Sequence, residues 1–154
     1  MSLPPFEILI ADDDKDDCYL FKQILDELEL PIHMTTMSDG EKLMSYLCDA
    51  TTILPHVLFL DLNMPRKNGF ECLSEIKTDE KLKHLPVVVF STSFEQETVN
   101  RLYASGAQYF IRKPADYTQY KTTIQQLVTH ISEDNTQQPA IKDFVFTIQD
   151  HLTP

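Results

Sequence analysis

The chain has 154 residues, of which 42% are apolar and 24% charged, and it carries a formal net charge of −11. This length and apolar content suit one globular domain, and no apolar run is long enough to cross a bilayer. Without a basic run the chain is a poor nucleic-acid binder, because Lys and Arg must replace the counterions of the phosphates. Since its start has no signal-peptide pattern, the chain is expected in the cytoplasm. The widely spaced Cys18, Cys48 and Cys72 are expected to remain thiols.

Five short apolar runs alternate with five segments of helical periodicity. The expected strands cover residues 6–11, 32–37, 57–60, 87–90 and 108–112. The expected helices cover residues 15–29 and the regions around 43–47, 70–76, 99–106 and 117–131. Strands without polar alternation are typical of a parallel sheet buried between two layers of helices. The pattern therefore predicts an α/β fold with a doubly wound, five-stranded parallel sheet.

The expected domain covers residues 6–133, and residues 134–154 are interpreted as a linker followed by a short apolar tail. Ile141, Phe144, Val145, Ile148 and Leu152 share one face of a helix, yet Phe144, Phe146 and Ile148 also alternate as a strand would. The secondary structure of the tail therefore stays open. Packing on its own domain and contact with a partner or a second copy are both possible for it.

Polar side chains stand where the apolar strands end. Asp12 and Asp13 follow the first strand, Asp61 the third, Ser91 the fourth and Lys113 the fifth. Ligands of open α/β sheets bind beyond these carboxyl ends. Converging carboxylates repel one another, and a hard cation such as Mg²⁺ relieves the repulsion. With Lys113 and Ser91 as holders of phosphate oxygens, the set predicts a phosphoryl site with a carboxylate nucleophile.

Other acids near the first strand have a local explanation. Asp14 is expected to cap the first helix, and Asp16 and Asp17 are expected to be solvated in its first turn, where the helix dipole favours acids. The five histidines are scattered without a nucleophile–base arrangement, so they are interpreted as structural or surface residues.

Four segments, in order and at matching spacing, resemble response-regulator receiver domains. They are ILIADDD at 8–14, VLFLDLNMPRKNGFE at 57–71, LPVVVFS at 85–91 and GAQYFIRKP at 106–114. The resemblance spans about residues 6–132. It implies a flavodoxin-like sheet of order 2-1-3-4-5, the order of the chemotaxis regulators of this family.

The resemblance also implies roles for individual residues. These are phosphoacceptor for Asp61; Mg²⁺ ligands for Asp12, Asp13, Asp61 and the backbone carbonyl of Asn63; phosphate binding for Ser91 and Lys113; a conformational switch for Ser91 and Phe110; and a cis peptide bond between Lys113 and Pro114. Two positions depart from the family pattern. Phe110 lacks the hydroxyl of a tyrosine, and Ala115-Asp116 stands where many relatives have an aromatic residue, so an output surface there is not carried over.

The implied function is two-component phosphorelay signalling. A histidine kinase or histidine phosphotransfer protein would supply the phosphoryl group, and the output would be a contact with a protein. A homodimer through the face of the fourth helix, fifth strand and fifth helix is one such contact. The chain is not expected to be a free-standing enzyme, because its own activity would be limited to self-phosphorylation and autodephosphorylation.

Two alternative functions fit these residues less well. A phosphatase of the haloacid-dehalogenase type needs a second carboxylate two residues after its nucleophile, and Asn63 occupies that position. A receiver-like adaptor that works without phosphorylation has no need of the complete acidic set.

Overall fold

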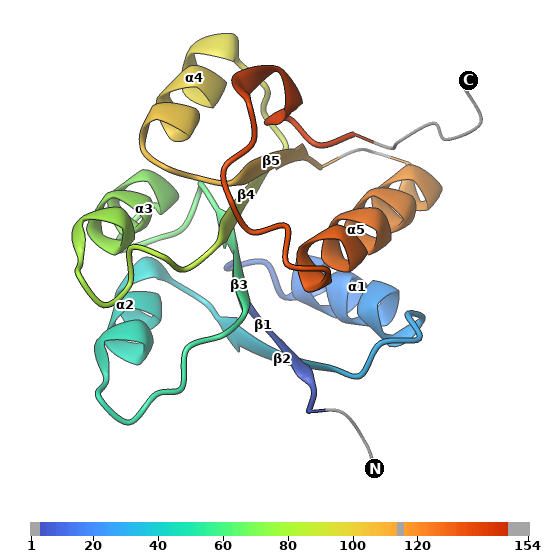
Figure 1. Ribbon diagram of the computed structural model, residues 1–154, viewed down its shortest axis with the longest axis horizontal. Helices are drawn as coiled ribbons and strands as arrows, with labels where there is room; N and C mark the ends of the chain where they lie inside the picture. The colour runs from blue at the N-terminus through green and yellow to red at the C-terminus, as the bar shows by residue number, and fades with distance from the viewer. Residues whose placement is uncertain (1–3, 114–115, 148–154) are drawn as a thin grey trace.

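The computed structural model describes residues 4–113 and 116–147, and in them strands and helices alternate along the chain as the sequence predicts (Figure 1). The strands are β1 (Phe6–Ala11), β2 (Ile32–Met37), β3 (Val57–Asp61), β4 (Val87–Ser91) and β5 (Tyr109–Arg112). The helices are α1 (Lys15–Asp26), α2 (Gly40–Cys48), α3 (Gly69–Thr78), α4 (Gln96–Ala104), α5 (Tyr117–Ser132) and the short 3₁₀ helix η1 (Ile141–Asp143).

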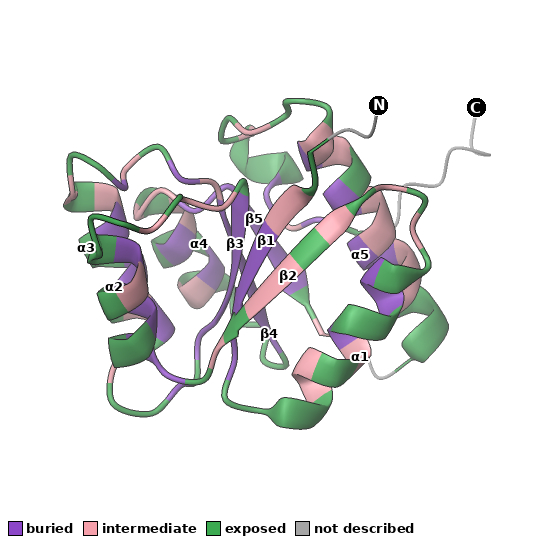
Figure 2. Cartoon of the chain, turned by 90° about the horizontal axis from the view of Figure 1, so that it is seen from below, coloured by how far each residue is buried: buried purple, intermediate pink, exposed green. Residues whose placement is uncertain are grey.

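The strands form one parallel sheet in the order β2-β1-β3-β4-β5. Helices α1 and α5 cover one face of the sheet, and α2, α3 and α4 cover the other (Figures 1 and 2). The predicted fold class and strand order are confirmed. Because all five strands run parallel, the strands that are followed by polar residues all end at the same edge of the sheet.

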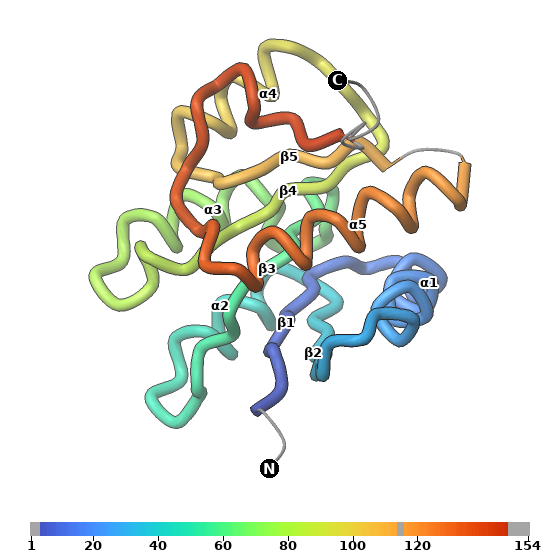
Figure 3. The backbone as a smooth tube through the Cα atoms, turned by 45° about the vertical axis from the view of Figure 1, so that its right-hand side comes forward, coloured from blue at the N-terminus to red at the C-terminus, as the bar shows by residue number. Residues whose placement is uncertain are grey.

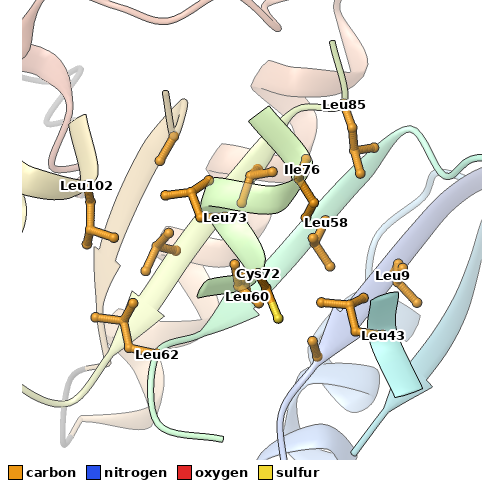
Figure 4. Packing of buried hydrophobic residues seen from close by; sticks show 14 of the residues in the cluster. Leu9, Leu43, Leu58, Leu60, Leu62, Cys72, Leu73, Ile76, Leu85 and Leu102 are labelled. Atoms are coloured by element: carbon orange, nitrogen blue, oxygen red, sulfur yellow. The ribbon is translucent and has the colours of Figure 1, made fainter. Parts of the chain in front are cut away.

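The sheet carries a hydrophobic core on each face. Every residue of β3 and β4 is buried, as the absence of polar alternation predicts, whereas the edge strand β2 is partly exposed (Figure 2). Figure 4 shows the cluster beneath α2, α3 and α4, where leucines of the central strands meet leucines of the helices. Burying one such side chain contributes about 1.5–3 kcal/mol, so the two faces hold the site's strands firmly in place.

Acidic and amide side chains cap the helices on the functional side of the sheet. Asp14 accepts hydrogen bonds from two backbone amides in the first turn of α1, as predicted. Asp39 caps α2 by accepting a hydrogen bond from the amide of Lys42. Asn68 and Glu71 form a reciprocal capping box at the start of α3. These caps satisfy amides that would otherwise lack partners next to the strand ends.

Helix α1 ends at Asp26, so the predicted end at residue 29 is wrong. The next two amides bond to carbonyls three residues earlier, which tightens the last turn. Pro31 follows closely, and a residue that precedes proline avoids the helical region. The last turn of the expected helix therefore becomes the turn into β2.

The chain returns after α5 along the outer edge of β5 (Figure 3). Residues 138–147, called the C-terminal segment below, include η1 and then pair with β5 through a parallel bridge between Phe110 and Val145. The described part of the tail thus packs on its own domain and mixes the two expected structures: a short 3₁₀ helix at Ile141–Asp143, a turn at Phe144 and a single bridge to the sheet at Val145. Ile148 and Leu152, the other apolar residues of that pattern, lie outside the described residues.

Candidate functional site

Three predicted carboxylates converge at the carboxyl edge of the sheet. Asp12 follows β1 and Asp61 ends β3, and both are buried, whereas Asp13 is exposed. One carboxylate oxygen from each can be chosen so that all lie within 4.8 Å of one another. Oxygen donors at this spacing, one of them open to solvent, fit a hard divalent cation such as Mg²⁺ or Mn²⁺.

Bringing these carboxylates together in a buried place disfavours their charged forms. Burial, aided by the charges of Asp12 and Asp13 and opposed by Lys113, raises the pKa of Asp61 to about 6. Burial also raises the pKa of Asp12, against a hydrogen bond from the amide of Asp14. The two buried acids therefore gain from any added positive charge.

The nearby positive charge is the ammonium of Lys113, which follows β5. It lies 3.1 Å from Asp12 Oδ2 and 2.9 Å from Asp17 Oδ2, and 4.4 Å from the centre of the Phe90 ring. Its burial lowers the pKa of Lys113, but the bonds to Asp17 and Asp12 outweigh this and hold the pKa above its ordinary value. The lysine is thus cationic at neutral pH and held on the α1 side of the site.

Asp17 is a functional candidate that sequence reasoning missed. It was interpreted as a solvated acid of the first helical turn, and it is in that turn, but its carboxylate pairs with Lys113. The sequence offered no signal that separates Asp17 from Asp14 and Asp16, because all three look alike as acids at the start of a helix.

A close backbone approach fixes the position of Asp61. At Gly69, the first residue of α3, a Cβ atom would lie only 2.6 Å from the backbone oxygen of Asp61. The amide of Gly69 also donates to the carbonyl of Leu62 at 3.0 Å. Only glycine allows α3 to pack this tightly against the end of β3.

The remaining predicted residues are placed around this group. Ser91 ends β4 and is buried, and its Oγ accepts a hydrogen bond from the amide of Ser93 at 3.2 Å. Asn63 is exposed, and its amide donates to Asp61 Oδ1 at 3.4 Å. Phe110 in β5 is fully buried and meets the Phe94 ring edge-on at 6.0 Å. The expected cis bond between Lys113 and Pro114 lies outside the described residues.

A doubly wound sheet with carboxylates and a lysine at one edge is the architecture of a two-component receiver, and comparison with known proteins agrees. The family model "Response regulator receiver domain" matches residues 8–125. Response regulator Rcp1 from Synechocystis is 33% identical over 116 residues, which cover 73% of this chain and 79% of that protein. Two-component response regulator ARR17 from Arabidopsis thaliana is 33% identical over 116 residues, covering 70% and 74%. The chain belongs to the response regulator receiver domain family.

Solved structures support the same assignment. The phosphorylated cyanobacterial phytochrome response regulator RcpA matches with a TM-score of 0.80 at 31% identity, over 86% of this chain and 98% of that one. The Mn²⁺-bound form of Rcp1 matches with a TM-score of 0.78 at 28% identity, over 88% and 100%.

Receiver domains take phosphoryl groups from histidine kinases, bind Mg²⁺ or Mn²⁺ in an acidic pocket and signal to downstream partners; they are generally not enzymes. Within the described residues, no helix is long and apolar enough to span a membrane.

Proposed function

We propose that this chain accepts a phosphoryl group on Asp61 from a phosphohistidine of a kinase or phosphotransfer protein, and that Mg²⁺ is required. The observation that supports this is the cluster of Asp12, Asp13 and Asp61 beside the Lys113 ammonium. Asp12, Asp13, Asp61 and the backbone carbonyl of Asn63 would hold the ion. When bound, Mg²⁺ would neutralise the carboxylates and the charge of the phosphoryl oxygens.

The chain's own groups account for the transfer. A carboxylate oxygen of Asp61 attacks the phosphorus, a P–O bond forms and the P–N bond breaks. The phosphohistidine ring, protonated on its other nitrogen, keeps the electron pair of the broken bond and leaves as neutral imidazole. Because the pKa of Asp61 is about 6, its carboxylate is mostly ionised at pH 7 even before a cation binds. Lys113 and Ser91 would then hold phosphoryl oxygens.

Phosphorylation with a small donor tests the proposal. In acetyl phosphate and Mg²⁺, the intact mass should rise by one phosphoryl group, and Asp61→Asn should abolish the rise. Chelation of Mg²⁺ should also prevent it. Glu29→Gln removes an exposed acid from the α1–β2 loop and should label as the wild type does. Labelling of Asp61→Asn to the wild-type level would refute the assignment of the acceptor.

We propose further that Ser91 and Phe110 transmit the phosphorylated state to a protein partner. The phosphoryl group adds charge and acceptor oxygens near Ser91, whose hydroxyl would turn to donate to it. Phe110 is already fully buried on the α4 side, so it gains by closer packing when its ring fills the space that this movement leaves beside α4. The face of α4, β5 and α5 would then differ between two states whose populations phosphorylation shifts.

Replacing Ser91 separates acceptance of the phosphoryl group from transmission. Ser91→Ala should still be labelled on Asp61 but should lose most of the amide chemical-shift change at Phe110 that a beryllofluoride mimic causes in the wild type. Ser93→Ala, in the exposed loop after β4, is the matched control. A full wild-type response at Phe110 in Ser91→Ala would show that the signal takes another route.

A further inference from the structure

The outer edge of β5 is occupied by the chain itself, at the residue proposed as the switch. The amide of Phe110 donates to the Phe144 carbonyl at 3.0 Å, and the Phe146 amide donates to the Phe110 carbonyl at 2.8 Å. Both backbone groups of Phe110 that face away from β4 are therefore bonded to the C-terminal segment. A second strand cannot pair with Phe110 while these bonds exist.

Two aromatic side chains of the segment straddle the edge of the sheet. Phe144 is fully buried on the α4 side, where its ring meets Tyr103 at 5.1 Å and 76°. Phe146 lies on the α5 side, against Tyr109 at 5.7 Å and His130 at 6.2 Å. The segment thus adds one aromatic side chain to each core of the domain.

Polar contacts hold the beginning of the segment against α4. The side-chain amide of Gln138 donates to the carbonyls of Tyr103 and Ala107, both at 2.8 Å. The Tyr103 hydroxyl donates to the Pro139 carbonyl at 2.7 Å. These bonds fall at the end of α4 and the turn that follows it, so the segment connects α4 to β5.

The position of Phe144 also limits where the Phe110 ring can lie. Both rings belong to the same buried cluster beneath α4, and Phe110 has no exposed surface. Because the segment bonds to both outer backbone groups of Phe110, a ring turned outward over the sheet edge would meet the docked segment. Docking therefore favours the inward ring. Further along, Val145 and Phe146 line the same hollow as Lys113, so the segment extends toward the phosphorylation site.

We infer that the outer edge of β5 is a strand-binding surface whose occupant is residues 138–147, and that docking of this segment and phosphorylation of Asp61 favour each other through Phe110. The inference rests on the proposed function, because it takes the inward Phe110 ring as the conformer that phosphorylation selects. Coupling of this kind is reciprocal: the free energy by which docking favours phosphorylation equals the free energy by which phosphorylation favours docking. Docking of the segment would then become more favourable on phosphorylation. Partners would contact α4 and α5 while the segment covers the outer edge of β5.

Hydrogen exchange in the full-length protein tests the coupling. The Phe146 amide, which donates to Phe110, should exchange at least about fivefold more slowly with beryllofluoride and Mg²⁺ than with Mg²⁺ alone. A factor of about five is the lower end of the usual range for coupling between two sites. An amide of α2, on the far side of the sheet, should show little change. Unchanged or faster exchange at Phe146, in protein that does bind beryllofluoride, would overturn the inference. Absence of any labelling on Asp61 would instead refute the proposed function.

A pair of variants isolates the backbone bond. Phe146→Ala and Phe146→Pro both lose the ring, but only proline also loses the amide that donates to Phe110. Beryllofluoride should bind Phe146→Pro about fivefold more weakly than Phe146→Ala. Equal affinities would overturn the coupling. If Phe146→Pro fails to fold, Gln138→Ala serves instead, because it removes only the two hydrogen bonds between the segment and the end of α4. This variant should bind beryllofluoride more weakly than the wild type. Binding with wild-type affinity would overturn the inference.

Discussion

Replacing Asp61 by asparagine is expected to stabilise the metal-free protein at pH 7 by up to about 3 kcal/mol, because a pKa raised from 3.8 to about 6 corresponds to roughly two units of 1.4 kcal/mol each. The cause is the burial of an ionised carboxylate, only 6% exposed, close to the charges of Asp12 and Asp13. Asparagine keeps the shape and the acceptor oxygen and removes the charge. The melting temperature should rise by several degrees in a domain of this size.

The pH dependence of this gain has a definite sign. The folded-state pKa of Asp61 lies above its unfolded value, so the wild type binds more protons when folded between about pH 4 and 6. Its stability falls, relative to the variant, as the pH rises through that window. The advantage of Asp61→Asn should therefore be small below about pH 4, about half of its full size near pH 5 and nearly complete above pH 7.

Chemical unfolding in a chelator at pH 5 and pH 7.5, repeated with Mg²⁺, measures the effect. The ion should remove most of the advantage, because the wild type offers it three carboxylates and the variant two. Glu29→Gln, which removes one exposed acid, should shift stability by less than about 0.5 kcal/mol. An equal gain at both pH values would mean that the charge of Asp61 is not its source.

Replacing Asp17 by asparagine is expected to weaken Mg²⁺ binding about tenfold, equivalent to about 1.4 kcal/mol. In the wild type, the Lys113 ammonium divides its bonds between Asp17 at 2.9 Å and Asp12 at 3.1 Å. Without Asp17, the lysine would keep only its ion pair with Asp12 and the charge attraction of Asp61, and it would compete with the ion for the same oxygens. Asp17 would thus be a positioning residue that keeps Lys113 beside the site without blocking it.

Asp16→Asn is the matched control, since it removes the same charge from the same helical turn, but Asp16 is exposed and forms no ion pair among the described residues. Titrating Mg²⁺ against the melting temperature or amide shifts gives the affinity of each variant. A loss shared equally by the two variants would show that only long-range charge matters. An unchanged affinity in Asp17→Asn would show that Lys113 does not depend on Asp17.

The fold could be predicted from sequence because its signals are local. Apolar runs without alternation mark β3 and β4 as strands buried on both faces, and acids such as Asp14 mark where helices begin. The convergence of Asp12, Asp13 and Asp61 was also predictable, because parallel strands that end in acid bring their ends to one edge. The end of α1 was missed because helix termini depend on a single turn of weak bonds.

Sequence by itself determined the class of this protein: alternating strands and helices, a parallel sheet, and an acidic site with a lysine at its carboxyl edge. Only the tertiary structure decided what lies between residues distant along the chain. The pairing of Asp17 with Lys113 joins positions 96 residues apart and depends on how α1 is rotated against the sheet. The apolar residues of the tail fit a helical and a strand pattern alike. The edge of β5 decides the conformation at Val145, because backbone groups buried at a sheet edge must find partners, whereas Ile141–Asp143 forms a 3₁₀ helix.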